Sequence, residues 1–284
     1  MSKNKKIIFL LAIIFSVVFV VFIFVLPKKD NLEVDFLDVG QGDSELIKTP
    51  YGQNILVDGG PDRTILKRLG GDLPFWDRKI DLMVLTHPHA DHVTGLNEVL
   101  KRYKVEKILY TGVLHSDPNY LNWLRFVRDK KIPIFIVDHP QIVKLGNDCE
   151  MDIIYPDENF VNKEFENLNN SSMAFKLKFK HETFLLAGDL EKDIEHKLVL
   201  GKTDLAANVF KADHHGSDTS NTEEFLNAVR PQIAIIEVGK DNKYGQPSGR
   251  VLKRFERVGT QVFRTDENGT VRVESDGEEI TVLN

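Results

Sequence analysis

The sequence predicts one mixed domain, of the α/β or α+β class, behind a single N-terminal membrane span. From about residue 31 onward, short runs rich in β-branched residues alternate with stretches of helical periodicity. A continuous apolar run precedes them. Because no low-complexity linker divides the rest of the chain, we expect residues 31–284 to form one domain.

The apolar run covers residues 7–26 and is interrupted only by Ser16. At about 1.5 Å of rise per residue, a helix of this length spans roughly 30 Å, the thickness of the hydrocarbon core of a bilayer. No small-residue cleavage site follows it, so we expect an uncleaved signal anchor rather than a removed signal peptide. Residues 1–30 are therefore predicted to form a membrane anchor and a short tether.

Charges indicate how the predicted span is oriented. Three lysines and the amino terminus precede it and two lysines follow it, which places the amino end in the cytoplasm and the domain of this single-pass membrane protein outside. Of 37 basic and 43 acidic residues, five lysines and one aspartate lie in residues 1–30, which leaves 32 basic against 42 acidic residues. Such a domain does not coat nucleic acid, so any anionic substrate must be attracted locally, by metal or a small basic patch.

Strand-like and helix-like stretches alternate along the domain. Ten apolar, β-branched stretches read as strands, at residues 32–40, 54–60, 80–87, 105–112, 132–138, 150–156, 173–180, 183–189, 208–215 and 233–239. Five stretches have helical periodicity, and several end in glycine or proline, at residues 93–103, 119–130, 190–200, 222–230 and 248–259.

A weak internal symmetry relates two parts of this pattern. One apolar strand leads to Asp58, and histidines follow 29 residues later at His87. A second apolar strand leads to Asp189, and histidines follow 25 residues later at His214. If two half-domains face each other, these side chains meet in one polar cleft between two sheets.

Five of the nine histidines lie in two clusters, at residues 87–92 and 214–215. Alternate residues of an extended chain share a face, so His87 and His89 can bind one metal ion. Asp91 and His92 come one turn later, close enough to bind a second ion. Imidazole and carboxylate donors without thiolate suit zinc, manganese or iron in an open catalytic site.

The motif His87-x-His89-x-Asp91-His92 after an apolar strand, with Asp58 upstream and Asp189 downstream, resembles the metallo-β-lactamase superfamily. Its members share an αββα sandwich, an α+β fold, and usually a two-metal site. More narrowly, the chain resembles the soluble hydrolase domain of ComEC-type competence DNA-uptake proteins from roughly Leu32 to the carboxyl end. The motifs that carry this resemblance are FLDVGQGDS at residues 36–44, NNSS at 169–172, ADHHGSDTS at 212–220 and NKYGQP at 242–247.

The resemblance implies two divalent metal ions, zinc or manganese. His87 and His89 would bind one ion and Asp91 and His92 the other, with Asp189 as the bridging carboxylate. Asp58 would orient metal-bound histidines from behind.

Four residues are expected to be catalytic, namely Asp91, Asp189, His214 and His215. One of the two adjacent histidines would complete a metal shell, a role we assign to His215, while the other faces the substrate as an electrophile or proton donor.

Substrate contacts are expected from Asp43, Ser44, Ser217 and Tyr244, with the Ser217 hydroxyl donating to a phosphate oxygen. The Gly-x-Gly of FLDVGQGD lacks the spacing and the following helix of a dinucleotide-binding loop, so no nucleotide cofactor is predicted.

The chain departs from the resemblance at Gln246, where the competence-type branch usually has histidine in Tyr-Gly-His-Pro. An amide oxygen is a poorer zinc ligand than imidazole. We therefore expect the ion beside Asp91 and His92 to bind more weakly. Asn or Ser in NNSS, where the superfamily often has a third histidine, is normal for this branch.

These features together predict metal-assisted hydrolysis of a phosphodiester. Two ions about 3.5–4 Å apart would lower the pKa of a shared water and neutralise charge at the attacked centre. The resemblance points to extracytoplasmic DNA or another phosphodiester, and to competence or uptake machinery as partner. Two alternatives stay open: a tethered binding module without a complete metal site, and a hydrolase of a lactam, lactone or thioester.

Overall fold

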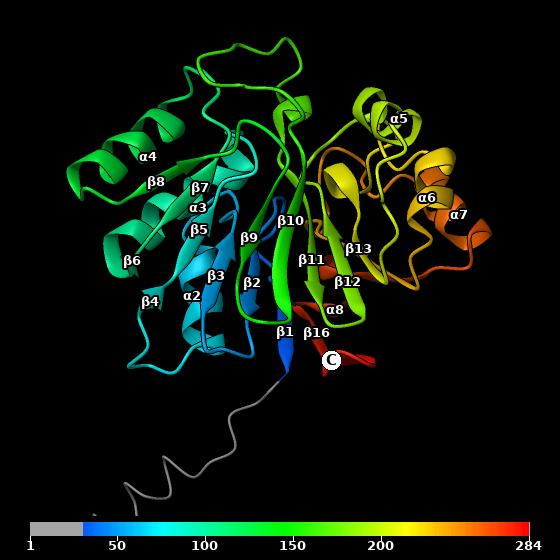
Figure 1. Cartoon of the computed structure of the whole chain (residues 1–284), viewed down its shortest axis with the longest axis horizontal. Coiled ribbons are helices and arrows are strands. Elements are labelled where there is room, and N and C mark those ends of the chain that lie inside the picture. The colour runs from blue at the N-terminus through cyan, green and yellow to red at the C-terminus, as the bar shows by residue number, and fades with distance from the viewer. Residues whose placement is uncertain (1–30, 284) are drawn as a thin grey trace, which may run out of the picture. The chain divides into compact units, whose positions relative to one another are not determined.

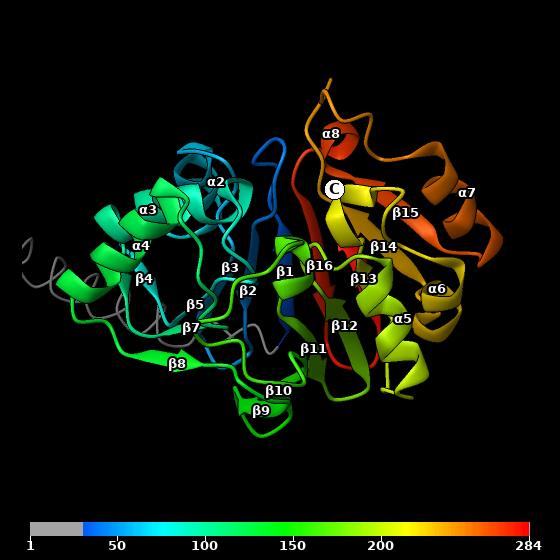
Figure 2. The same ribbon diagram turned by 90° about the horizontal axis from the view of Figure 1, so that it is seen from above.

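Two β-sheets packed face to face form the centre of the structure (Figures 1 and 2). The computed structural model describes residues 31–283. The predicted anchor and tether at residues 1–30 lie outside the described residues and stay a prediction. None of the helices between residues 31 and 283 combines the length and the apolar character that a bilayer crossing requires.

The first sheet has eight strands, antiparallel in its first half and parallel in its second. In order across the sheet they are β17 (Ile280–Leu283), β16 (Val271–Ser275), β1 (Leu32–Phe36), β2 (Glu45–Lys48), β3 (Asn54–Val57), β5 (Leu82–Val84), β7 (Ile108–Tyr110) and β8 (Ile134–Ile136). The parallel strands are those from β3 to β8.

The second sheet repeats this plan with seven strands. In order they are β9 (Gln141–Lys144), β10 (Cys149–Tyr155), β11 (Ala174–Phe179), β12 (Glu182–Leu186), β13 (Val209–Lys211), β14 (Ile233–Ile236) and β15 (Gln261–Arg264). Strands β12 to β15 are parallel, as β3 to β8 are. A separate two-stranded ribbon joins β4 (Lys79–Ile80) to β6 (Lys104–Val105).

Helices cover the outer face of each sheet, because parallel neighbours need crossover connections. The first sheet carries α2 (Thr64–Asp72), α3 (Ala90–Arg102) and α4 (Pro118–Asp129), and the second carries α5 (Lys192–Leu200), α6 (Glu223–Val229) and α7 (Gly249–Arg257). Shorter turns are α8 (Thr265–Asn268), η1 (Leu168–Ser171) and η2 (Asp213–Gly216). The expected αββα sandwich is therefore confirmed.

Three apolar cores follow from the alternation of side chains along the strands. In β2, Ile47 faces the core between the two sheets, whereas Leu46 faces the core under α2, α3 and α4. In β12, Phe184 likewise faces the inter-sheet core and Leu185 the core under α5, α6 and α7. Burial on both faces explains why β12 reads as an apolar run rather than as strict alternation.

Several elements escape the sequence prediction, namely α2, α8, β2, β9, β15, β16 and β17. The last turn of helix α2 contains Gly70 and Gly71, and glycine lowers helix propensity by about 1 kcal/mol per residue. The helix forms because Ile65 and Leu69 are buried against the first sheet. Packing here outweighs local propensity.

Two glycines bring the start of α3 into backbone contact with the turn after β3. Gly59 N donates to His92 O at 2.8 Å, and Gly95 N donates to Gly60 O at 2.9 Å. A Cβ at Gly95 would overlap Gly59 O, and one at Gly59 would lie 2.5 Å from Leu96 N. Only glycine permits this approach, which places α3 beside the residue that follows β3.

We predict that Gly95→Ala lowers the free energy of unfolding by about 2–3 kcal/mol, since the new methyl group would meet backbone that cannot move aside. Gly71→Ala in α2 is the matched control: its Cβ would meet nothing within 4 Å, so it should raise stability by up to about 1 kcal/mol. Urea denaturation of both variants measures the difference. Equal stability of the two would contradict the contact.

Candidate metal centre

The ends of two pairs of parallel strands meet at one end of the sandwich. Asp58 directly follows β3, and His87 comes three residues after β5. In the second sheet, Asp189 comes three residues after β12, and the turn η2 with His214 and His215 follows β13. The two halves face each other as the internal symmetry predicts.

A first group of metal donors consists of His87, His89 and Asp189, whose donor atoms all lie within 4.8 Å of one another. His87 Nε2 is 2.9 Å from His89 Nδ1 and 3.9 Å from Asp189 Oδ2. Burial lowers the pKa of His87 well below its usual range. Its imidazole is therefore neutral, which is the form that binds metal.

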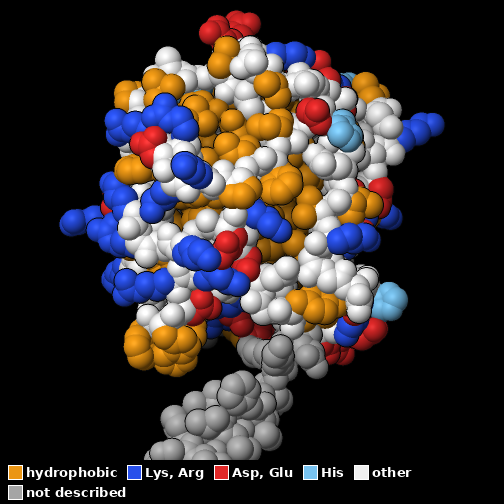
Figure 3. All heavy atoms as spheres, turned by 60° about the vertical axis from the view of Figure 1, so that its left-hand side comes forward, with side chains coloured by type: hydrophobic (Ala, Val, Ile, Leu, Met, Phe, Trp, Pro, Cys, Tyr) orange, Lys and Arg blue, Asp and Glu red, His pale blue; other side chains and the backbone are white. Residues whose placement is uncertain are grey.

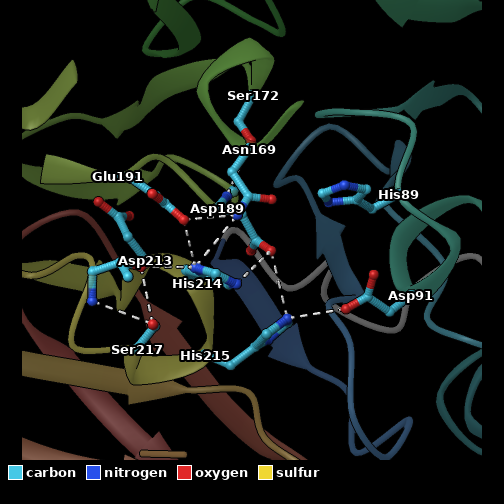
Figure 4. Close-up of polar contacts among 12 residues, drawn as sticks. His89, Asp91, Asn169, Ser172, Asp189, Glu191, Asp213, His214, His215 and Ser217 are labelled. Carbon is cyan, nitrogen blue, oxygen red and sulfur yellow. Dashed lines mark hydrogen bonds and ion pairs between the residues drawn. The ribbon is translucent and has the colours of Figure 1, made fainter. Parts of the chain in front are cut away.

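A second group consists of Asp91, His92, Asp189 and His215, again within 4.8 Å. Figure 4 shows Asp189 facing His215, which in turn faces Asp91. His215 Nε2 lies 3.3 Å from Asp91 Oδ2 and 3.6 Å from Asp189 Oδ2, and His92 Nε2 lies 3.3 Å from Asp189 Oδ2. Asp189 belongs to both groups, so the two candidate metal positions share one carboxylate.

Hydrogen bonds to Nδ1, on the side away from the donor cluster, fix the imidazoles of His92 and His215. His92 Nδ1 lies 2.7 Å from Asp58 Oδ2, and Asp58 also accepts bonds from Thr86 N at 2.9 Å and Thr86 Oγ1 at 2.5 Å. His215 Nδ1 lies 2.9 Å from Glu237 O. Both rings therefore present Nε2 to the donor cluster, as metal-binding histidines commonly do.

Two buried atoms of the cluster have no hydrogen-bond partner within residues 31–283. They are His92 Nε2 and Asp189 Oδ1, although buried polar atoms are normally paired. Both belong to residues of the donor groups. Divalent metal ions would satisfy these atoms and offset the acidic charge, so the residues present fit a metal.

The charges around His92 and His215 act against the effect of burial. Burial alone would lower the pKa of His92, but the carboxylates around it, Asp189 and Asp58 foremost, raise that pKa well above its usual range. Asp189 and Asp43 raise the pKa of His215 well above its usual range in the same way. Both side chains are therefore positively charged imidazolium groups at neutral pH when no metal is bound. A metal ion would have to displace a proton from each.

A buried ion pair lies beneath the donor cluster. The Lys211 ammonium contacts the Asp43 carboxylate and donates to Gly188 O at 3.0 Å. Asp43 Oδ1 lies 3.1 Å from His215 Nδ1. Despite the cost of burying Asp43, the positive charge of Lys211 holds its pKa below the usual value.

Asp43 and Ser44, which were expected to contact substrate, do not line the pocket over the donor groups. Both side chains are fully buried behind the metal centre. Ser44 N donates to Glu237 Oε1 at 3.0 Å, and Ser44 Oγ donates to Asp58 O at 3.2 Å. These residues support the cluster from inside.

Buried charged residues near the cluster were not anticipated from the sequence, namely Glu45, Lys211 and Glu237. Burial and the negative charge of Asp43 raise the pKa of Glu237 to about 8. The sequence did contain a signal for two of these buried charges, because Lys211 in NVFK and Glu237 in IIEV each lie within an apolar strand. Such a residue must find a buried partner.

A pocket of about 320 Å³ opens over the donor groups. His214 lines it, partly exposed and outside both donor groups. His214 Nδ1 lies 3.2 Å from Thr219 Oγ1. It also lies 3.4 Å from Glu191 Oε1 (Figure 4). Tyr244 also lines the pocket, whereas Ser217 does not and instead lies 3.0 Å from Thr219 Oγ1 through its hydroxyl.

Gln246 lines the same pocket but is held by other groups. Its Nε2 donates to His214 O at 3.2 Å, and its Oε1 accepts from Gln41 Nε2 at 2.7 Å. Both ends of the Gln246 amide are therefore engaged by protein groups, which braces the loop over the pocket.

This four-layer sandwich and its histidine–aspartate cluster define a metal-dependent hydrolase. The chain belongs to the metallo-beta-lactamase superfamily, whose family model matches residues 37–239. The resemblance seen in the motifs is thereby confirmed at the level of the family.

Relatives confirm the narrower resemblance to competence proteins. The chain is 30% identical over 274 residues to "ComE operon protein 3" of Bacillus subtilis, covering 90% of this chain and 34% of the relative. It is 28% identical over 250 residues to "Competence protein ComA" of Neisseria gonorrhoeae, covering 86% and 32%. The chain thus spans about a third of the length of these relatives.

A solved structure shares the fold. It is CmlA, a diiron β-hydroxylase from Streptomyces venezuelae, with a TM-score of 0.54 and 16% identity over 90% of this chain and 55% of that one. At this identity the likeness concerns the fold alone.

We predict that metal binding releases protons, up to about two per chain at neutral pH, because the raised pKa values of His92 and His215 leave both imidazoles protonated without metal. The apparent affinity should rise with pH and level off above those pKa values. Calorimetric titration in buffers of different ionisation enthalpy measures the release. A binding heat that is the same in every buffer would contradict it.

Proposed function

We propose that the protein is a membrane-anchored, metal-dependent phosphodiesterase that acts on extracytoplasmic DNA or another phosphodiester. The observation that carries this proposal is that Asp189 belongs to both donor groups. Sites that share a carboxylate hold two ions close together, an arrangement common in enzymes that cleave phosphodiesters.

In this proposal, His87, His89 and Asp189 hold one divalent ion, zinc or manganese. Asp91, His92, Asp189 and His215 hold the other. The ions would make a water molecule more acidic and offset the charge that develops at phosphorus. Asp58 keeps His92 in the tautomer whose unprotonated Nε2 faces the ion. The distance of 2.7 Å between His92 Nδ1 and Asp58 Oδ2 supports this role.

His214 is proposed to act on the substrate directly. It lines the open pocket, and its Nε2 lies 3.9 Å from Asp189 Oδ2. Glu191 and Thr219 hold its Nδ1 side, so Nε2 is directed toward the donor cluster. From there it can donate a proton to the leaving oxygen. Tyr244, on the rim, and Ser217, close to His214, are proposed to contact the substrate chain.

The names of the relatives support the choice of substrate and partner. They are called competence or com-operon proteins, which favours DNA as the phosphodiester and uptake machinery as the partner. The predicted anchor places the domain outside the cytoplasm in a single-pass arrangement.

Parallel assays of the purified, metal-loaded chain test the proposal. We expect hydrolysis of single-stranded DNA and of a chromogenic phosphodiester, and no hydrolysis of nitrocefin. Turnover of nitrocefin alone would favour a lactam-type substrate. Full metal content without hydrolysis of any of the three would favour a tethered binding module.

The metal content of variants should show which ion each donor group binds. We predict about two ions per chain in the natural protein, about one in His89→Ala and less than one in Asp189→Asn, because only Asp189 serves both positions. Contrary to the expectation drawn from Gln246, the ion at His87 and His89 should leave first on chelation, since three protein donors hold it and four hold the ion beside Asp91 and His92.

Elemental analysis after dialysis measures these contents, and hydrolysis should fall at least about 100-fold in both variants. His196→Ala, at an exposed histidine outside both donor groups, is the control and should keep both ions. Two ions retained in Asp189→Asn would rule out a shared carboxylate.

The adjacent histidines should differ in their effects. His214→Gln is expected to lower kcat by about 10²–10⁴-fold with metal content unchanged, because His214 acts as a proton donor outside the donor groups. His215→Ala should lower metal content first, and added metal should restore part of its activity. Loss of metal in His214→Gln would reverse the two roles.

A further inference from the structure

An exposed aromatic pair projects from the loop between α2 and β4. Phe75 is 82% exposed and Trp76 is 74% exposed. Their ring centroids are 4.8 Å apart in an edge-to-face arrangement. The two most exposed large apolar side chains within residues 31–283 are thus neighbours, which marks an interaction surface rather than scattered exposure.

Hydrogen bonds hold this loop in place. Asp77 N donates to Pro74 O at 2.8 Å, which closes a turn around the aromatic pair. Asn54 Nδ2 donates to Asp77 Oδ2 at 3.0 Å and to Lys79 O at 3.2 Å. The pair is therefore presented by an ordered loop that is attached to the first residue of β3.

The loop lies at the end of the first sheet where the described chain begins. Asn54 is paired with Lys48, and Lys48 is paired with Glu33 at the start of β1. Figure 1 shows β4 and the start of β1 at the same end of the sheet. The other end of β3 leads to Asp58, so the metal centre and the aromatic pair lie at opposite ends of this strand.

We propose that this end of the domain docks on the lipid surface of a membrane, with Phe75 and Trp76 inserted among the headgroups. The proposal rests on the membrane anchor included in the proposed function. Only four residues, 27–30, separate the predicted span from Asn31. An extended chain reaches at most about 3.6 Å per residue, so the end at which β1 begins is kept near the bilayer.

The chemistry of the loop fits a lipid interface. Tryptophan combines a large apolar ring with an N–H donor and is enriched at the level of lipid headgroups. Basic side chains lie on the same end, on the loop and on the β4–β6 ribbon. Arg78 and Lys107 have no ion-pair partner within residues 31–283, whereas Lys79 pairs with Asp81. Free cations of this kind attract lipid phosphates.

A groove beside the loop extends this surface. It has a volume of about 460 Å³ and opens between the edge strands β8 and β9. Apolar side chains such as Ile55, Leu82 and Phe135 line it, together with basic side chains (Lys79, Lys107, Lys144) and acidic ones (Asp81, Glu106). Figure 3 shows apolar side chains gathered in a hollow on this side of the molecule, with basic side chains around them. Lipid contact would cover both the groove edge and the aromatic pair.

Tryptophan fluorescence tests the docking in the full chain, reconstituted in phosphatidylcholine–phosphatidylglycerol vesicles. The sequence has two tryptophans, and Trp123 is fully buried. We expect a blue shift of Trp76 emission and its quenching by lipids with brominated acyl chains. Trp76→Phe is the matched control: it keeps Trp123 as the only emitter, changes no buried side chain, and should show neither effect.

Phe75→Ser should reduce the quenching of Trp76 while the chain still floats with the vesicles, because the anchor is unchanged. Flotation with no more quenching in the natural protein than in Trp76→Phe would overturn the docking and leave the anchor intact. Failure to float would overturn the anchor and the docking with it. Phosphodiester hydrolysis, assayed on the same samples, should be equal in Trp76→Phe and the natural protein, so failure of the hydrolase proposal is scored separately.

Discussion

The buried ion pair between Asp43 and Lys211 joins the two halves of the sandwich beneath the metal centre. Lys211 ends a strand of the second sheet, and Asp43 lies in the loop between two strands of the first. Removing one partner of such a pair costs about 3–5 kcal/mol, because the other charge is left buried alone. Through Gly188 O and His215 Nδ1, the same pair fixes the backbone next to the shared carboxylate and one imidazole of the second donor group. The geometry at the sheet ends depends on this contact.

Strand burial, the internal symmetry and the family motifs allowed much of the fold and of the donor cluster to be predicted from the sequence. Strands that are buried on both faces appear as apolar runs. The internal symmetry predicted that Asp58 and His87 meet Asp189 from the other half in one cleft. The family motifs supplied what spacing could not, namely the expected role of Asp189 as the bridging carboxylate. The αββα arrangement is confirmed, and the structure places the expected metal donors in two groups that share Asp189. Their roles as ligands stay a proposal.

The failures concern features that depend on contacts distant in sequence. Asp43 and Ser44 lie in a polar loop that was expected at the cleft, but the loop turns inward to meet Lys211 and Glu237. Gln246 was judged by the residue it replaces, and only the fold shows that Gln41 and the His214 carbonyl occupy its amide. His214 and His215 both have left-handed backbone, with φ of 48° and 54°. No local pattern in the sequence predicts that conformation for two adjacent histidines.

The contact between Gly59 and Gly95 offers a way to read other chains of this kind. Because it joins two stretches of backbone, it is required for the shape of the centre but takes no part in binding metal. A chain that keeps both glycines but has lost its histidines should retain the backbone geometry of the metal centre without binding metal or catalysing hydrolysis. A chain with the histidines but with bulky residues at both positions should have to support them differently. These two glycines therefore distinguish a chain that has lost activity but kept the backbone of the site from a chain that supports its ligands on a different backbone. The metal ligands alone do not make this distinction.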